Sequence, residues 1–288
     1  MTLGSFLGVL FDGFAYGMLL FLLSVGLSVT LGMMNFINLA HCAFAMLGGF
    51  VTVTLSRHFG WPFLATLPLA FIVAAAVSVV LERLLYRRLY RASELDQVLL
   101  TIGLAFMSVA GAAYFFGTVQ QPVETPSFLR GSVSVLGSSL GAYRLFIIAM
   151  GLGIALLLVL TLEYTRFGAQ VRAAVDNQRM ARGLGINVDR AFAVTFALGC
   201  GLAGLGGALA IEMVGLDHSF ALVYLVYVLI VVSVGGLGSI GGSFAAAALL
   251  GISDMLGKYY VPELGAFLIY LVMIGILMWR PTGLFGSR

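Results

Sequence analysis

Three polar side chains interrupt one apolar segment of the chain at a regular spacing. Asn35, Asn38 and His41 lie three residues apart, which places them near one face if the segment is helical. An amide or an imidazole at membrane depth is costly unless it faces a cavity or another helix. Two interpretations stay open: these side chains form hydrogen bonds between helices, or they line a path for a polar solute.

A glycine-rich stretch, SVGGLGSIGGSF at 233–244, interrupts a second apolar segment. Glycine at this density ends a helix or lets backbones approach closely. Paired, glycine-interrupted segments in two halves of a chain point to a central substrate site. We therefore predict that Ser233 and Ser239 line the path together with the three polar residues. The stretch lacks the lysine of a P-loop, and we expect no nucleotide to bind this chain.

No pattern in the sequence indicates catalysis. His41 directly precedes Cys42, and successive residues of a helix diverge by about 100°, so the two do not form a nucleophile–base pair. Cys42 and Cys200 lie in apolar segments without the spacing of metal ligands, and we interpret them as packing residues. We expect no catalytic residue, metal or cofactor in this chain, which is therefore not an enzyme.

The most polar stretch lies between Glu163 and Arg190, and residues 164–190 are termed here the docking loop. It holds five of the 15 basic residues of the chain: Arg166, Arg172, Arg179, Arg182 and Arg190. So many charges on one short loop of an apolar protein indicate a surface presented to a partner.

Within the docking loop, residues 168–184 are compatible with one helix that Gly183, Gly185 and Asn187 end. Its charged stripe is formed by Arg172, Asp176, Arg179 and Arg182, and Asp176 can pair with Arg172 and Arg179. Its small, mostly apolar face is formed by Val171, Ala174, Val175 and Gln178. Alanine and valine anchor weakly in lipid, so this face is predicted to insert into a groove of another protein.

Composition places the chain in a membrane. Hydrophobic residues make up 61% of it and charged residues 9%, against about 25% charged in a soluble domain. The charge-free gaps are 13–56, 58–81, 97–123, 145–162, 191–211, 218–253 and 264–279. A helix crosses the hydrocarbon with about 20 residues, so the first and sixth gaps each allow two passes. We predict an all-α polytopic membrane protein with about eight to nine passes, some broken or re-entrant, forming one domain over 1–288.

The basic residues predict the orientation, because they concentrate on the cytoplasmic side. Arginines cluster around 83–91, in the docking loop, and at 280 and 288. This pattern fits about nine passes only with the N-terminus outside and the C-terminus inside. The polar stretch 118–143, with Pro122 and Pro126, then forms an external loop that is a plausible docking surface.

Four blocks of sequence together resemble a known family. They are GLSVTLGMMNFINLAHCAFAMLGG, TRFGAQVRAAVDNQRMARGLGINVDRAFAVTFALG, VGGLGSIGGSFAAAALLG and RPTGLFG. In this order, and over nearly the whole chain, they are similar to the permeases of high-affinity branched-chain amino-acid ABC importers. One departure is Cys42, where such relatives are expected to carry glycine after the histidine.

The resemblance implies partners and a location that the residues alone do not. It implies a second, related permease in a heterodimer, two cytosolic ATPase subunits that carry ATP and Mg, and a periplasmic substrate-binding protein. It places the chain in the bacterial inner membrane and matches the family's ATPase-coupling helix to residues 168–186. The coupling residues are then Arg172, Ala174, Val175, Asp176, Arg179, Arg182 and Gly185.

Two other functions compete with this one. A secondary carrier needs ionisable groups deep in the membrane, but Asp12, Glu82, Glu163, Glu212 and Asp254 are all predicted at span ends. A permease of the same type for urea or short amides remains open, because a path of Asn, Ser, Gly and apolar side chains suits both kinds of solute.

Overall fold

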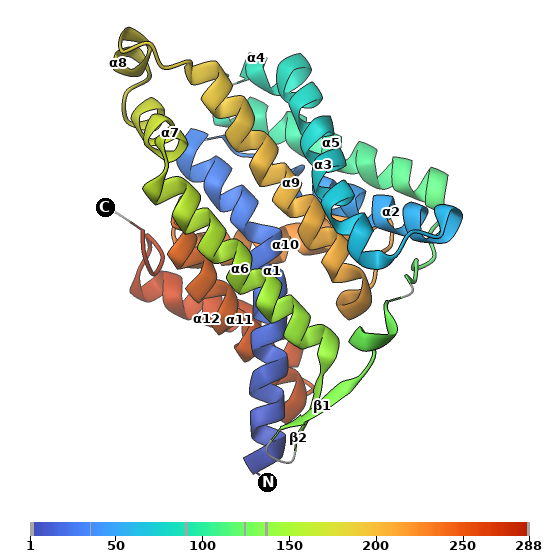
Figure 1. Ribbon diagram of the computed structural model, residues 1–288. Coiled ribbons are helices and arrows are strands. Elements are labelled where there is room, and N and C mark those ends of the chain that lie inside the picture. The colour runs from blue at the N-terminus through green and yellow to red at the C-terminus, as the bar shows by residue number, and fades with distance from the viewer. Residues whose placement is uncertain (1–2, 35, 90–91, 124, 136–137, 287–288) are drawn as a thin grey trace.

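The computed structural model describes residues 3–34, 36–89, 92–123, 125–135 and 138–286, and it is almost entirely helical (Figure 1). Its long apolar helices form one bundle. They are α1 (Leu3–Met34), α2 (His41–Phe59), α3 (Phe63–Leu81), α5 (Glu94–Phe116), α6 (Ala142–Tyr164), α9 (Val188–Val214), α10 (Phe220–Gly235), α11 (Ile240–Tyr260) and α12 (Gly265–Trp279). Among the described residues, 7 helices are long and apolar enough to cross a membrane, while α10 and α12 are shorter. The helices fall where charges are missing from the sequence.

Short elements join these helices. They are the π-helical turn η1 (Glu82–Tyr86), α4 (Arg87–Leu89), the 3-10 turn η2 (Ser127–Leu129), β1 (Ser132–Val135), β2 (Ser138–Gly141), α7 (Arg166–Asp176) and α8 (Gln178–Gly183). The two strands form an antiparallel hairpin in which Ser132 lies opposite Gly141. This hairpin belongs to the stretch that was predicted to form an external loop.

The short elements lie at opposite ends of the bundle. The helices α4, α7 and α8 lie together at one end, and the beginning of α1 and the β hairpin lie at the other (Figure 1). These are termed the loop end and the hairpin end. The chain therefore gathers its two arginine-rich connections at the loop end.

The centre of the bundle is formed by α1 and α9, the two helices with the largest buried share. They approach closely because both carry glycine at the crossing: a Cβ atom on Gly26 would lie 2.0 Å from the carbonyl oxygen of Gly199. Small residues at a crossing let membrane helices pack backbone to backbone. By contrast, α5 is the least buried of the candidate spans, and it shields one side of α2.

The docking loop differs from its prediction. Residues 168–184 form two helices rather than one, because Asn177 has extended backbone and its side chain caps the start of α8 by accepting from the amide of Met180 at 3.0 Å. Asparagine is a preferred residue at such caps. The side chain of Thr165 caps α7 in the same way through the amide of Gly168.

Candidate functional site

The first interrupted segment is a true break in the helices. Helix α1 ends at Met34 and α2 begins at His41, with residues 36–40 non-helical between them. Asn35 lies outside the described residues. The condition for a shared helical face is therefore not met by Asn38 and His41, because Asn38 sits on irregular backbone and His41 is the first residue of α2. Both side chains are fully buried.

Asn38 and His41 each use only part of their hydrogen-bonding capacity. The Asn38 side-chain oxygen accepts from the amide of Ala40 at 3.1 Å, and Nε2 of His41 lies 3.1 Å from the carbonyl oxygen of Leu23. A carbonyl only accepts, so Nε2 carries the proton and Nδ1 is an acceptor. In the described part of the chain, Asn38 Nδ2 and His41 Nδ1 are buried without a hydrogen-bond partner. They remain able to bind a polar group.

Helix α5 supplies the groups that hold the break in place. The Gln97 side-chain oxygen accepts from the amide of Ile37 at 3.3 Å, and the Thr101 hydroxyl lies 3.4 Å from the carbonyl oxygen of Ile37. Irregular backbone at membrane depth is tolerated only where other protein groups satisfy it or where it lines a cavity. Sequence reasoning missed both residues, although two uncharged polar side chains four residues apart share one helix face and could have signalled a partner.

The second interrupted segment forms the turn between α10 and α11, as expected of a hairpin. It meets the end of α1, since a Cβ atom on Gly32 would lie 2.0 Å from Cα of Gly238. Nearby, the hydroxyl groups of Ser28 and Ser243 form a buried hydrogen bond of 2.8 Å. The two interrupted segments therefore approach one another, but through backbone and through serines that were not predicted.

The predicted path serines have other surroundings. Ser233 is exposed near the end of α10. Ser239 caps α11 by accepting from the amide of Gly242 at 3.0 Å. Among the described residues, no hydrogen bond joins either serine to Asn38 or His41.

An apolar cleft of about 510 Å³ lies between α2, α3 and α5, beside the break. The residues that line it include Ala40 of the break, Phe44 of α2, Tyr86 of η1, and Leu104 and Phe115 of α5. Tyr86 is buried and packs against Phe36 in the break, with ring centroids 5.4 Å apart. The cleft thus offers apolar surface that reaches Ala40, which lies between Asn38 and His41 in the sequence.

The apolar face of the docking loop packs inward, against the prediction that it inserts into a partner. Ala174 of α7 and Ala181 of α8 are buried against Val188 and Phe192 of α9, with Met34 of α1 beside them. Val171 is buried as well. Because these small residues lie next to the end of α1, the loop is tied to the helix that precedes the break.

A different set of apolar side chains points outward from the docking loop. Val175 is 39% exposed, Met180 is 67% exposed and Leu184 is 79% exposed. Gln178 is exposed too. Of the face predicted to dock, Val175 and Gln178 remain available to a partner.

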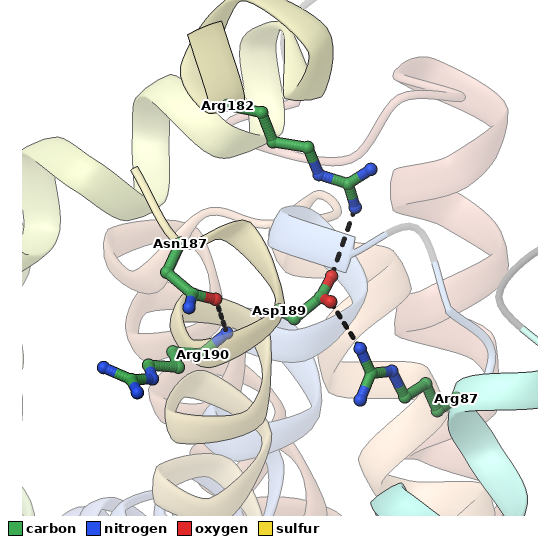
Figure 2. Close-up of polar contacts among 5 residues, drawn as sticks. All are labelled: Arg87, Arg182, Asn187, Asp189 and Arg190. Atoms are coloured by element: carbon green, nitrogen blue, oxygen red, sulfur yellow. Dashed lines mark hydrogen bonds and ion pairs between the residues drawn. The ribbon is translucent and has the colours of Figure 1, made fainter. Parts of the chain in front are cut away.

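The charges of the docking loop also pair differently from the prediction. Asp189 in the first turn of α9 binds both Arg87 of α4 and Arg182 of α8 (Figure 2), the latter at 3.1 Å. The Asn187 side chain caps α9 through the amide of Arg190 at 3.0 Å. In the parts of the chain that the structure describes, no ion pair joins Asp176 to an arginine, and Arg172 donates to the carbonyl oxygen of Leu162.

Asp254, one of the acidic residues expected at span ends, is buried within a helix. Asp254 is 1% exposed within α11, and Lys258 Nζ binds it at 2.6 Å. The same ammonium group lies 5.5 Å from the ring centre of Tyr16 on α1. The buried carboxylate is therefore paired, which is how membrane proteins accommodate such groups.

Comparisons with known proteins agree on one family. The chain matches the family model described as "Branched-chain amino acid transport system / permease component" over residues 9–277. It is 26% identical to the "High-affinity branched-chain amino acid transport system permease protein LivH" of Escherichia coli K12, over 98% of this chain and 96% of the relative. No solved structure matches the chain.

Two other organisms carry similar proteins. The "Probable branched-chain amino acid transport permease protein LivH" of Methanocaldococcus jannaschii is 28% identical over 94% of this chain and 90% of its own length. The permease protein BraD of Pseudomonas aeruginosa is 25% identical over 98% of this chain and 96% of its own length.

Proposed function

The chain belongs to the family of branched-chain amino acid transport system permease components, and from that premise we propose that it carries branched-chain or related small hydrophobic amino acids. It is a permease subunit of an ATP-binding-cassette importer. It lies in the inner membrane of a bacterium and crosses that membrane several times. Hydrolysis of ATP, with its Mg, belongs to partner subunits.

The observation that carries the proposal is the break at residues 36–40. Buried Asn38 in the break and buried His41 directly after it offer an amide donor and an imidazole acceptor without partners in the described structure, and Ala40 between them lines an apolar cleft. An amino acid with a hydrocarbon side chain needs both kinds of surface. A transport path should make only a few weak contacts with its cargo, because a permeation site must release that cargo. Asn35 is proposed to belong to the same path.

The orientation proposed is that of the sequence, with about nine passes, the N-terminus outside and the C-terminus inside. Its support is the arrangement of the ends: the arginine-bearing α4, α7 and α8 lie at the loop end, and the β hairpin lies at the opposite end (Figure 1). The loop end is then cytoplasmic. The hairpin end faces the periplasm, where a substrate-binding protein would dock.

The proposed partners are a second permease of the same family, two cytosolic ATPase subunits and a periplasmic binding protein. The docking loop is the surface proposed for an ATPase subunit, since its outward Val175, Met180 and Leu184 are apolar side chains on an otherwise charged surface, a combination typical of interaction sites. Arg172, Asp176, Arg179 and Gly185 flank these side chains in the sequence.

Uptake by the assembled importer in membrane vesicles tests this function. We expect ATP inside the vesicles to drive entry of radiolabelled leucine in the presence of the binding protein, and a proton ionophore to leave that entry unchanged. Urea is the competing cargo. Entry of urea without leucine would move the assignment to the amide permeases, and entry driven by an ion gradient without ATP would make the chain a secondary carrier.

A further inference from the structure

One carboxylate joins three separate elements at the loop end. Asp189 begins α9, Arg182 belongs to α8, and Arg87 belongs to α4, which continues α3 through η1. Figure 2 shows the two guanidinium groups reaching Asp189 from different sides, while Arg190 points away from it. Asp189 thus connects the docking loop to a distant part of the sequence.

Stability of the fold does not explain this arrangement. The side chains of Arg87 and Asp189 are 55% and 50% exposed, and exposed ion pairs contribute little to folding stability. The position of Asp189 in the first turn of α9 is favourable for a negative charge, but it needs no second arginine. A contact of this kind can position two elements relative to each other while adding little to the stability of the fold.

The ion pairs of Asp189 with Arg87 and Arg182 are termed the bridge. On its Arg87 side, the bridge lies next to residues that contact the break and line the cleft. Arg87 directly follows Tyr86, which is fully buried. The Tyr86 ring packs against Phe36 of the break and Phe196 of α9, with centroid distances of 5.4 Å and 5.1 Å. Tyr86 also lines the apolar cleft. A displacement of α4 therefore reaches the break through packed aromatic rings, the kind of contiguous network that transmits coupling.

Loss of the carboxylate would do more than remove an attraction. Two guanidinium groups contact the same side chain, so without its charge they would face each other as like charges, which repel. Neutralising Asp189 should therefore separate α8 from α4 while the inner contacts of Ala174 and Ala181 keep the docking loop on α9.

We propose that Asp189 is a positioning residue that passes movement of the docking loop to Tyr86 and the break through Arg87. This rests on the proposed function, in which an ATPase subunit acts on the docking loop. Asp189 belongs to the docking loop but is not one of the outward apolar side chains, Val175, Met180 and Leu184, that are proposed to touch that subunit. Its role is to couple the loop to the membrane helices, and binding of the ATPase does not depend on it.

The test follows the cleft directly, in membranes that hold the complete importer. Ser108 lines the cleft on α5, and a cysteine placed there, with Cys42 and Cys200 replaced by alanine, reports on the cleft by its rate of reaction with a water-soluble maleimide. We expect trapping with ATP and vanadate to change this rate by about fivefold or more, the range of ordinary coupling between sites. In Asp189→Asn the change should disappear, while the ATPase subunits still co-purify with the permease.

Controls separate positioning from a structural role. Asp189→Glu keeps the charge and should restore the nucleotide-dependent change. Arg88→Gln removes the neighbouring exposed arginine of α4, which is not part of the bridge, and should leave the change intact. Arg87→Gln combined with Asp189→Asn should be no worse than either alone, because both remove the same contact.

The outcomes are distinct. The proposal is overturned if vanadate trapping leaves the rate at position 108 unchanged in the wild type, if Asp189→Asn keeps the full change, or if Arg88→Gln loses it equally. The labelling experiment requires nucleotide but no amino acid. Leucine uptake, measured in parallel, therefore tests the proposed substrate independently of the role of Asp189. Absent uptake with intact coupling would reject the substrate and keep the role of Asp189.

Discussion

At the scale of single residues, the break depends on side chains that satisfy backbone groups. Ile37 has no helical neighbour to pair with, and Gln97 and Thr101 of α5 reach its amide and its carbonyl. The Gln97 side-chain nitrogen also donates to the carbonyl oxygen of Leu89 at 3.2 Å. One buried side chain therefore ties the break to α5 and to the end of α4.

Replacing Gln97 with leucine should loosen the break. The amide of Ile37 would lose its partner, and a buried amide left unpaired costs about 1–3 kcal/mol. We expect a lower melting temperature of the detergent-solubilised importer and slower uptake. The matched control is Ser108→Ala on the same helix, whose hydroxyl donates only to the backbone of its own turn at Ala105. An unchanged melting temperature in Gln97→Leu would contradict the role given to it.

Asn38→Leu tests the path itself. Leucine is similar in size but removes the unpartnered amide, so uptake should fall, by roughly fivefold for a lost hydrogen bond of ~1 kcal/mol, while the affinity of the binding protein for cargo stays the same. A cysteine at 35 or 38, in a background without Cys42 and Cys200, should react with water-soluble reagents in at least one transport state. If it stays inert throughout a working cycle, these residues only pack helices.

The interruption at Asn38 and His41 could be predicted from sequence because polar groups stand out in an apolar segment. Their geometry could not, because residues 36–40 are non-helical and helical spacing does not apply to them. Ser28 and Ser243, which join α1 to α11, gave no such signal, since serine is common in membrane helices and pairing across a large sequence separation is set by packing.

At the scale of elements, the docking loop divides its side chains between two tasks. Ala174 and Ala181 face the bundle, and Val175, Met180 and Leu184 face outward. The apolar pattern of the sequence showed that the loop was amphipathic. It did not show which face lay inward. The non-helical residue Asn177 separates α7 from α8, and the start of α9 supplies the inner surface.

Substitutions on the two faces of the docking loop should have different effects. Val175→Asp and Met180→Asp place a charge on the outward surface, where burial in a partner without pairing costs several kcal/mol. We expect the permease to insert normally and ATPase subunits to be lost on purification. Ala181→Asp places the charge inside the chain's own cluster, so the amount of permease in the membrane should fall. Full ATPase stimulation in Val175→Asp would refute the docking surface.

At the scale of the whole molecule, composition was enough to predict an all-α polytopic membrane protein and the positions of its apolar helices. Charge-free gaps predicted each apolar helix, including two in each long gap. How the helices pack was beyond sequence reasoning, because contacts such as Gly26 on Gly199 join residues that only the folded bundle brings together. The same limit hid the bridge at Asp189.

The two ends of the bundle should be labelled from opposite sides of the membrane. Phe128 is 63% exposed at the hairpin end, and Met180 is 67% exposed at the loop end. In a background without Cys42 and Cys200, a cysteine at 128 should react with an impermeant maleimide in intact cells, and one at 180 only after the cells are opened. The reverse pattern would invert the proposed topology.

The end of the described chain completes a helix made much earlier in synthesis. The amides of Leu284 and Phe285 donate to the carbonyl oxygens of Val234 and Gly235 at the end of α10, at 2.7 Å and 3.2 Å. A helix end left without such partners in a membrane is unfavourable. During translation the end of α10 therefore lacks these two hydrogen bonds until the ribosome has made α11, α12 and the residues that follow them. Removal of residues 284–286 would leave every long helix present but would leave the carbonyl oxygens of Val234 and Gly235 without these donors.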